Sequence, residues 1–196
     1  MARKRVAILI SGRGSNMVAL IEAAKAPSYP AEIVVVISND PSATGLARAA
    51  EAGIKTAVVD HKPFGRDREA FERALQAELV ANQVELVCLA GFMRLLTPWF
   101  VRQWEGRLLN IHPALLPAFK GLDTHARALA AGVKEHGATV HFVVPEMDSG
   151  PIILQGKVAV EPGDTEAALA ARVLAVEHRI YPEALRIVAE GNTPQT

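Results

Sequence analysis

Short runs typical of buried strands alternate with segments of helical spacing along the first half of the chain, and this alternation limits the possible folds. The strand-like runs occupy residues 6–10, 33–37, 55–60 and 85–90. Helical spacing marks residues 17–26, 46–52 and 68–82. Runs without polar alternation are typical of strands buried on both faces, as in parallel sheets covered by helices. The pattern therefore predicts a doubly wound α/β sheet.

The second half of the chain predicts a different arrangement. Strand-like segments at residues 108–111, 139–144 and 152–160 accompany a short helix at 126–131 and a long one at 165–189, interrupted near Pro182. We expect at least one antiparallel pairing here, which makes the mostly parallel sheet mixed. No internal repeat or linker divides residues 1–196, so one domain is expected, with residues 191–196 as a frayed tail.

Charge and cysteine content narrow the class of protein. The 21 Lys and Arg residues equal the 21 Asp and Glu residues, so no strong overall charge favours a nucleic-acid or membrane partner. Cys88 is the only cysteine, which rules out an internal disulfide. The apolar run at residues 6–10 is too short for a signal peptide or a membrane span. We expect a cytoplasmic protein that acts on small molecules.

Ligands of doubly wound sheets bind beyond the carboxyl ends of the strands, which directs attention to the turn at Gly12, Gly14, Ser15 and Asn16. Met17 stands where a dinucleotide fingerprint needs a third glycine, and no Gly-Lys-Ser/Thr follows as in a P-loop. Two interpretations fit this turn equally well. It either offers backbone N–H groups to a phosphate at a helix N-terminus or is a capped turn without a ligand.

A second candidate is the segment Asn110-Ile111-His112-Pro113. Side-chain alternation on an extended segment points Asn110 and His112 to the same side. An amide donor beside an imidazole suits acyl chemistry, because the amide stabilises an oxyanion and the imidazole moves a proton. A histidine near the end of a buried strand also fits a purely structural role. The other histidines lack the spacing of zinc ligands, so we expect no metal site.

Two further segments each allow two interpretations. The sequence Asp148-Ser149-Gly150 is ordinary turn chemistry, but an Asp148 carboxylate that reaches His112 would favour the imidazolium form. The apolar residues that follow the strand at 85–90, including Met93, Leu95, Leu96 and Trp99, fit either plain core or a slot for a flat heterocycle.

Taken together and in this order, four segments resemble the glycinamide ribonucleotide formyltransferases. They are residues 10–16, 89–94, 109–117 and 148–152. The resemblance extends from about residue 5 to about residue 190. The pattern Asn-x-His-Pro-x-Leu-Leu-Pro is highly specific for folate-dependent formyl carriers, although several relatives share it.

The resemblance implies transfer of formyl from 10-formyltetrahydrofolate to the amine of glycinamide ribonucleotide, in purine biosynthesis. It implies catalytic roles for Asn110, His112 and Asp148. It assigns substrate binding to Gly14, Ser15, Asn16 and Glu177. It assigns the folate site to Arg68, Met93, Arg94, Leu95, Leu96, Asn110, Val144, Pro145, Glu146, Met147 and Asp148. No metal is implied, and the oligomeric state stays open, a homodimer included.

This chain departs from some family members at two positions. Leu174 stands where some carry a polar residue, and Asp123 stands where some carry histidine. Both departures concern substrate contacts and leave the reaction class unchanged.

Three other functions are considered. A formyltetrahydrofolate deformylase uses the same trio with water as acceptor but carries an additional N-terminal domain, for which we expect no room before Arg5. Methionyl-tRNA formyltransferase carries a further C-terminal RNA-binding domain. A non-catalytic α/β nucleotide-binding module would keep the glycine turn without needing Asn110, His112 and Asp148 together.

Overall fold

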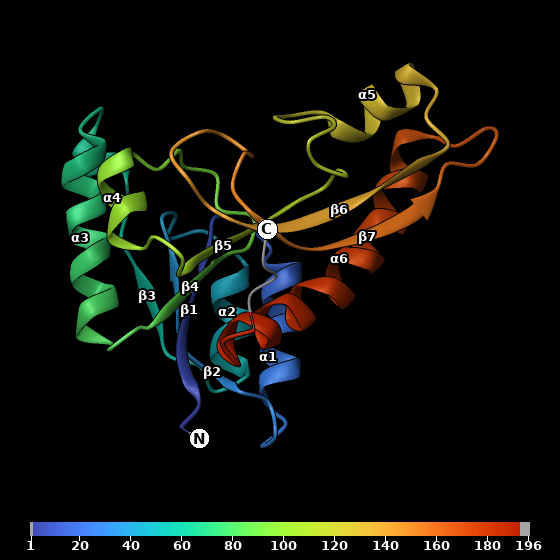
Figure 1. The fold of residues 1–196 in the computed structure, drawn as a ribbon. Helices are drawn as coiled ribbons and strands as arrows, with labels where there is room; N and C mark the ends of the chain where they lie inside the picture. The colour runs from blue at the N-terminus through green and yellow to red at the C-terminus, as the bar shows by residue number, and fades with distance from the viewer. Residues whose placement is uncertain (1, 193–196) are drawn as a thin grey trace.

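A seven-stranded sheet forms the centre of the structure, a computed structural model that describes residues 2–192. The strands lie in the order β3-β2-β1-β4-β5-β6-β7 (Figure 1). Their bounds are Lys4–Ile10 for β1, Ala31–Ser38 for β2, Thr56–Val58 for β3, Leu86–Leu89 for β4, Leu108–His112 for β5, Glu135–Phe142 for β6 and Ile152–Ala159 for β7. The first five strands are parallel, and β6 and β7 are antiparallel to their neighbours. The predicted mixed, doubly wound sheet is confirmed.

Helices cover both faces of the sheet, as Figure 1 shows. They are α1 (Ser15–Ala24), α2 (Gly45–Glu51), α3 (Arg68–Ala81), α4 (Pro98–Gln103), α5 (Thr124–Ala131) and α6 (Glu166–Ala189), with a short 3₁₀ turn at Lys62–Phe64. Side chains along β1 point alternately to the two faces of the sheet, so the core has two parts, one on each face. Val6, Ile8 and Ile10 face α1 and α6, whereas Ala7 and Leu9 face α3 and α4. Because both faces are buried, the strand has no polar side.

Helix α6 is continuous, contrary to the predicted interruption near Pro182. Proline removes one backbone hydrogen bond and costs about 3 kcal/mol in a helix interior. Tyr181 and Leu185 are fully buried against the sheet, each contributing roughly 1.5–3 kcal/mol. Tyr29 also donates a hydrogen bond to the carbonyl oxygen of Pro182, at 2.6 Å. Tertiary packing therefore preserves the helix through the proline.

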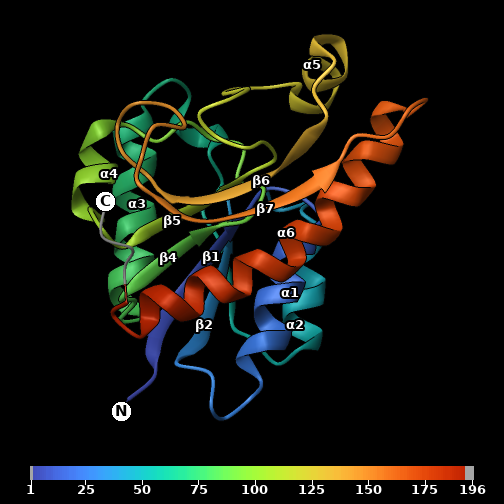
Figure 2. The same cartoon turned by 45° about the vertical axis from the view of Figure 1, so that its right-hand side comes forward.

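The prediction of a strand at residues 139–144 was wrong at both ends, because β6 spans Glu135–Phe142. The first residues of β6 pair with β7 through a close approach of the two backbones. A side chain at Gly137 would place its Cβ 1.9 Å from the carbonyl oxygen of Gly156. The absence of a side chain at Gly137 thus allows the strands to meet, a pairing that local propensity did not indicate. In Figure 2 this long hairpin extends past the parallel sheet, with α6 along it.

Two short elements were not predicted. The 3₁₀ turn at Lys62–Phe64 and helix α4 contain Pro63 and Pro98, respectively, in their first turn. At the end of α6, Gly191 and Asn192 donate backbone hydrogen bonds to the last turn. The other residues of the expected tail, 193–196, lie outside the described residues. None of the helices within residues 2–192 combines the length and apolarity needed to span a membrane.

The strand order reverses at β1, in the middle of the sheet. The chain proceeds from β1 outward to β2 and β3, then returns to the other side of β1 for β4 and β5. In such sheets the connections diverge where the order reverses, and ligands bind at the carboxyl ends there. The turn at residues 11–14 follows β1, and residues 90–97 follow β4. These two segments therefore flank the expected ligand position.

Candidate active site

The turn after β1 leaves the first backbone N–H groups of α1 available to a ligand. Gly14 occupies the position before the helix with φ 67° and ψ 42°, a left-handed conformation that favours glycine. No side chain caps this end of α1. The interpretation of a capped turn is therefore wrong for this structure. Uncapped N–H groups at a helix N-terminus are a suitable site for a phosphate.

Asn16 points away from its own helix end and contacts α6 instead. Its Nδ2 donates to Oε1 of Glu177 at 3.1 Å, and both side chains are buried. Burial raises the pKa of Glu177 above its ordinary value, although the Asn16 hydrogen bond works in the opposite direction. The Asn16 Oδ1 atom is buried without a hydrogen-bond partner. The structure thus joins two residues far apart in sequence and leaves one acceptor beside the turn that precedes α1.

Asn110 and His112 lie on β5, two residues apart, so their side chains share one face of the strand. The His112 ring is buried between two oxygen atoms. Its Nε2 lies 2.8 Å from the Phe119 carbonyl oxygen, and its Nδ1 lies 3.6 Å from Oδ2 of Asp148. A carbonyl can only accept, so Nε2 carries a proton. A second proton on Nδ1 suits the nearby carboxylate, so this arrangement accommodates the imidazolium form.

Asp148 lies in the loop after β6 and is held by the segment after β5. Its Oδ2 accepts a hydrogen bond from the Gly121 N–H at 2.8 Å, and its backbone has φ 51°. Phe119 and Asp123 also have positive φ values, both 54°. Such conformations are uncommon outside glycine, and backbone strain concentrates at functional sites. The loop after β6 and the segment after β5 thus meet at His112 through strained residues.

Three further histidines surround His112, and sequence reasoning gave them little weight. His125 Nδ1 lies 3.1 Å from His136 Nε2. Burial, followed by the charges of His125 and His112, lowers the pKa of His136 to about 4. His141 pairs with Asn110 in the β5–β6 register, and burial lowers its pKa. These residues are distant from His112 in sequence and match no motif, so only the fold indicates their proximity.

The residues predicted for the pterin pocket lie on two loops at the carboxyl side of the sheet. Met93 and Leu95 follow β4 and are 72% and 63% exposed, and Met147 lies in the loop after β6 at 62%. Arg94, Leu96 and Val144 are half-buried, whereas Pro145 and Glu146 are exposed. Large apolar side chains open to solvent on neighbouring loops are typical of a ligand-binding surface.

In the part of the chain that the structure describes, Arg68, Leu174 and Asp123 form no hydrogen bond or ion pair with His112. Arg68 is exposed at the first residue of α3, and no hydrogen bond or ion pair within residues 2–192 joins it to another predicted site residue. Leu174 is partly exposed on α6, and Asp123 precedes α5. Among the described residues, no three His, Cys, Asp or Glu side chains are grouped to hold a metal ion.

Comparison with known proteins places these features in a family. The formyl transferase family matches residues 4–185. Phosphoribosylglycinamide formyltransferase from Escherichia coli is 48% identical over 95% of this chain and 87% of its own length. A crystal structure of phosphoribosylglycinamide formyltransferase from Brucella melitensis is 54% identical, with a TM-score of 0.92 over 99% of this chain and 100% of that one.

A longer relative contains the same region. The trifunctional purine biosynthetic protein adenosine-3 of Gallus gallus is 52% identical over 95% of this chain, which spans only 18% of that protein's length. The matches to the shorter bacterial proteins cover nearly all of both chains. The chain therefore belongs to the formyl transferase family, in the group of phosphoribosylglycinamide formyltransferases.

Proposed function

We propose that this protein transfers the formyl group of 10-formyltetrahydrofolate to the amine of glycinamide ribonucleotide, a step of purine biosynthesis. The observation that carries the proposal is the buried His112 ring, which has Asp148 on one side and shares a strand face with Asn110. The names of the relatives from Escherichia coli and Brucella melitensis support the same reaction.

The two substrates suit different groups of residues at the site. The uncapped end of α1 at Gly14, Ser15 and Asn16 suits the phosphate of the ribonucleotide. The free Asn16 Oδ1 and the Glu177 carboxyl group suit the N–H groups of the glycinamide. The apolar side chains of residues 93–96 and 144–147 suit a flat pterin ring, and Arg68 suits the acidic tail of the folate.

The chemistry follows from the groups around His112. The substrate amine attacks the formyl carbon, and the carbonyl electrons move to oxygen, giving a tetrahedral intermediate. The Asn110 amide and the protonated His112 ring stabilise that oxygen. The C–N bond to the folate then breaks, its electron pair returns to the folate nitrogen with a proton, and the amine loses its own proton. His112 mediates proton movement, and Asp148 keeps the ring oriented and charged.

In this scheme the substrate replaces one partner of His112. The Phe119 carbonyl oxygen accepts from His112 Nε2 in the structure. The formyl oxygen would replace it as the acceptor during the reaction. We further propose a cytoplasmic location and small-molecule substrates only, since the net charge is zero and Cys88 is buried and unpaired. A homodimer is compatible with the proposal.

The first prediction concerns the molecule that accepts the formyl group. We expect release of tetrahydrofolate to depend on glycinamide ribonucleotide, with little release when water is the only acceptor, because the phosphate turn and Glu177 position an amine at the formyl carbon. Initial rates with and without the ribonucleotide measure this dependence. Equal rates under both conditions would instead indicate a deformylase, and no release under either would leave a non-catalytic binding module.

The phosphate turn gives the second prediction. We expect Gly14→Val to raise the KM for the ribonucleotide by roughly 10-fold or more, because a β-branched residue is strained at φ 67°. Its Cβ would also lie 3.1 Å from Met17 Cε. Steady-state kinetics with each substrate varied in turn provides the measurement. Gly53→Val, at φ 77° beyond α2, is the matched control. Equal weakening of both substrates in a folded Gly14 variant would contradict a dedicated phosphate site.

A further inference from the structure

The segment 91–97 carries four of the residues predicted to contact the pterin, yet it has no regular secondary structure. It begins after β4 at Gly91, with φ 68°, and ends where α4 begins at Pro98. Met93 and Leu95 point into solvent and contribute little packing to hold it. A ligand pocket needs such a wall held in one position, and contacts near the two ends of the segment supply this restraint.

One end is held by a hydroxyl group that follows β1. The Met93 N–H donates to Ser11 Oγ at 2.8 Å. Ser11 in turn donates its single proton to Oδ1 of Asn39 at 2.5 Å, and Asn39 is buried. A hydroxyl has one proton and two lone pairs, so the bond to Asn39 orients an acceptor lone pair toward Met93. Ser11 immediately precedes the turn that reaches Gly14.

The other end is held by a buried carboxylate on α3. Oε2 of Glu72 accepts from the Thr97 N–H at 2.6 Å, and its Oε1 accepts from the Thr97 hydroxyl. The Glu72 side chain is fully buried, and burial raises its pKa although both Thr97 bonds lower it. Arg68 lies four residues earlier, one turn away on the same helix. Glu72 therefore connects the helix that carries Arg68 to the segment that carries residues 93–96.

We propose that Glu72 and Ser11 are positioning residues for the folate pocket, which hold the segment 91–97 from its two ends in the conformation that receives the pterin. The identity of the ligand rests on the proposed function. Neither residue is required to contact the folate. Their role is to fix the wall of the pocket before binding, so that ordering this segment costs no affinity.

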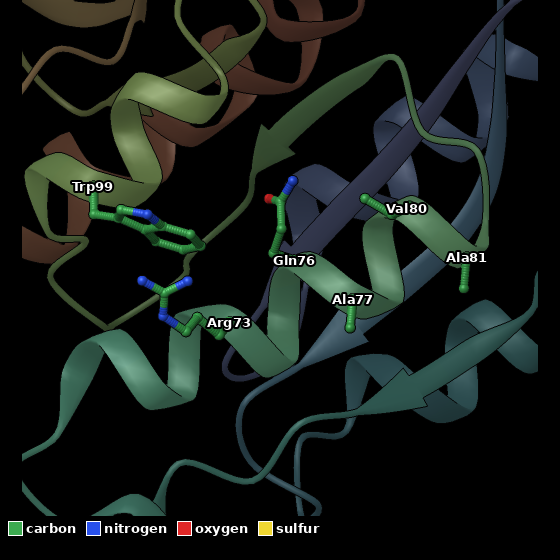
Figure 3. Close-up of a pocket in the computed structure, with 6 residues that line it drawn as sticks. All are labelled: Arg73, Gln76, Ala77, Val80, Ala81 and Trp99. Carbon is green, nitrogen blue, oxygen red and sulfur yellow. The ribbon is translucent and has the colours of Figure 1, made fainter.

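Loss of the Glu72 contact need not detach α4, because other contacts join the two helices. Trp104 Nε1 donates to Gln76 Oε1 at 2.7 Å, and the Arg73 guanidinium carbon lies 4.4 Å from the centre of the Trp99 ring. Figure 3 shows Arg73, on α3, beneath Trp99. Both residues line a cavity of about 510 Å³. Variants at Glu72 and Thr97 therefore test positioning in a folded protein.

The third prediction concerns Glu72→Gln, which keeps the side-chain length but turns one acceptor oxygen into a donor. We expect the KM for 10-formyltetrahydrofolate to rise about 10-fold, while kcat and the KM for the ribonucleotide change less than about threefold. Ser11→Ala should raise the folate KM similarly, because it removes the acceptor for Met93. Glu105→Gln and Ser28→Ala, both at exposed positions, are the matched controls.

Thr97 separates a positioning role from a general loss of stability. Thr97→Val removes the hydroxyl but keeps the backbone N–H, and should raise the folate KM. Thr97→Ser keeps the hydroxyl, so its folate KM should stay at the wild-type value. Combining Glu72→Gln with Thr97→Val should be scarcely worse than the poorer single variant, because both changes remove one shared contact. This series decides the proposal even if Glu72→Gln fails to fold.

Calorimetric titration with tetrahydrofolate makes the test independent of turnover. We expect Glu72→Gln to weaken tetrahydrofolate binding about as much as it raises the folate KM, with the thermal unfolding transition still cooperative. Unchanged binding in the folded variant would overturn the proposal, as would equal weakening of both substrates. If the wild type binds tetrahydrofolate but transfers no formyl group, the proposed function fails. The calorimetric titration of the variants still tests the positioning role in that case.

Discussion

His112→Ala is expected to lower kcat for formyl transfer by roughly 10²–10⁴-fold, and Asn110→Ala by roughly 10²–10³-fold. His112 is the buried histidine at the end of β5 that we propose as the acid–base group, and Asn110 presents an amide on the same face. Both contributions arise mainly in the transition state, when negative charge develops on the formyl oxygen. We therefore expect kcat to fall much more than the affinity for either substrate.

Steady-state kinetics together with tetrahydrofolate titration checks this prediction. Asn192→Ala, at an exposed position beyond α6, is a matched control for loss of an asparagine amide. Thermal unfolding verifies that each variant is folded. A folded His112→Ala protein that retained kcat within about threefold of wild type would remove the histidine from the mechanism.

Asp148→Asn is expected to lower kcat by roughly 10²–10⁴-fold through loss of charge with little change of shape. Asparagine tolerates the positive φ of this position, and its amide oxygen can still accept from the Gly121 N–H. The loop should therefore keep its conformation. What disappears is the negative charge 3.6 Å from His112 Nδ1.

Combining Asp148→Asn with His112→Ala tests whether the two residues act together. Groups that act as one unit show strongly non-additive losses, so the double variant should be scarcely slower than His112→Ala alone. If the loss of kcat in the double variant equalled the product of the two single losses, Asp148 would contribute independently of the histidine. In that case the orienting role assigned to the carboxylate would be wrong.

The sequence predicted the sheet better than the elements around it. The apolar runs at residues 6–10 and 33–37 lie within β1 and β2, because buried parallel strands require apolar side chains on both faces. It failed where tertiary contacts override local preference. Pro182 lies inside α6 because α6 packs on the sheet, and residue 137 in β6 is glycine because a side chain there would meet the Gly156 carbonyl oxygen.

The candidate site could be predicted only where residues form contiguous motifs. Asn110 and His112 are neighbours on one strand, so their common direction follows from β geometry. The approach of Asp148 to His112 and of Glu177 to Asn16 spans long stretches of chain and depends on the fold. Glu72 resembles any other glutamate in an amphipathic helix, and only its burial against Thr97 reveals a specific contact.

The fate of a labelled formyl group tests the central claim most directly. Wild-type protein would be given 10-formyltetrahydrofolate labelled with carbon-13 in the formyl group, together with glycinamide ribonucleotide, and the products followed by NMR. The account predicts that the label appears as an N-formyl amide on the ribonucleotide, in equal amount to the tetrahydrofolate released. Label recovered as formate, with the ribonucleotide unchanged, would contradict it.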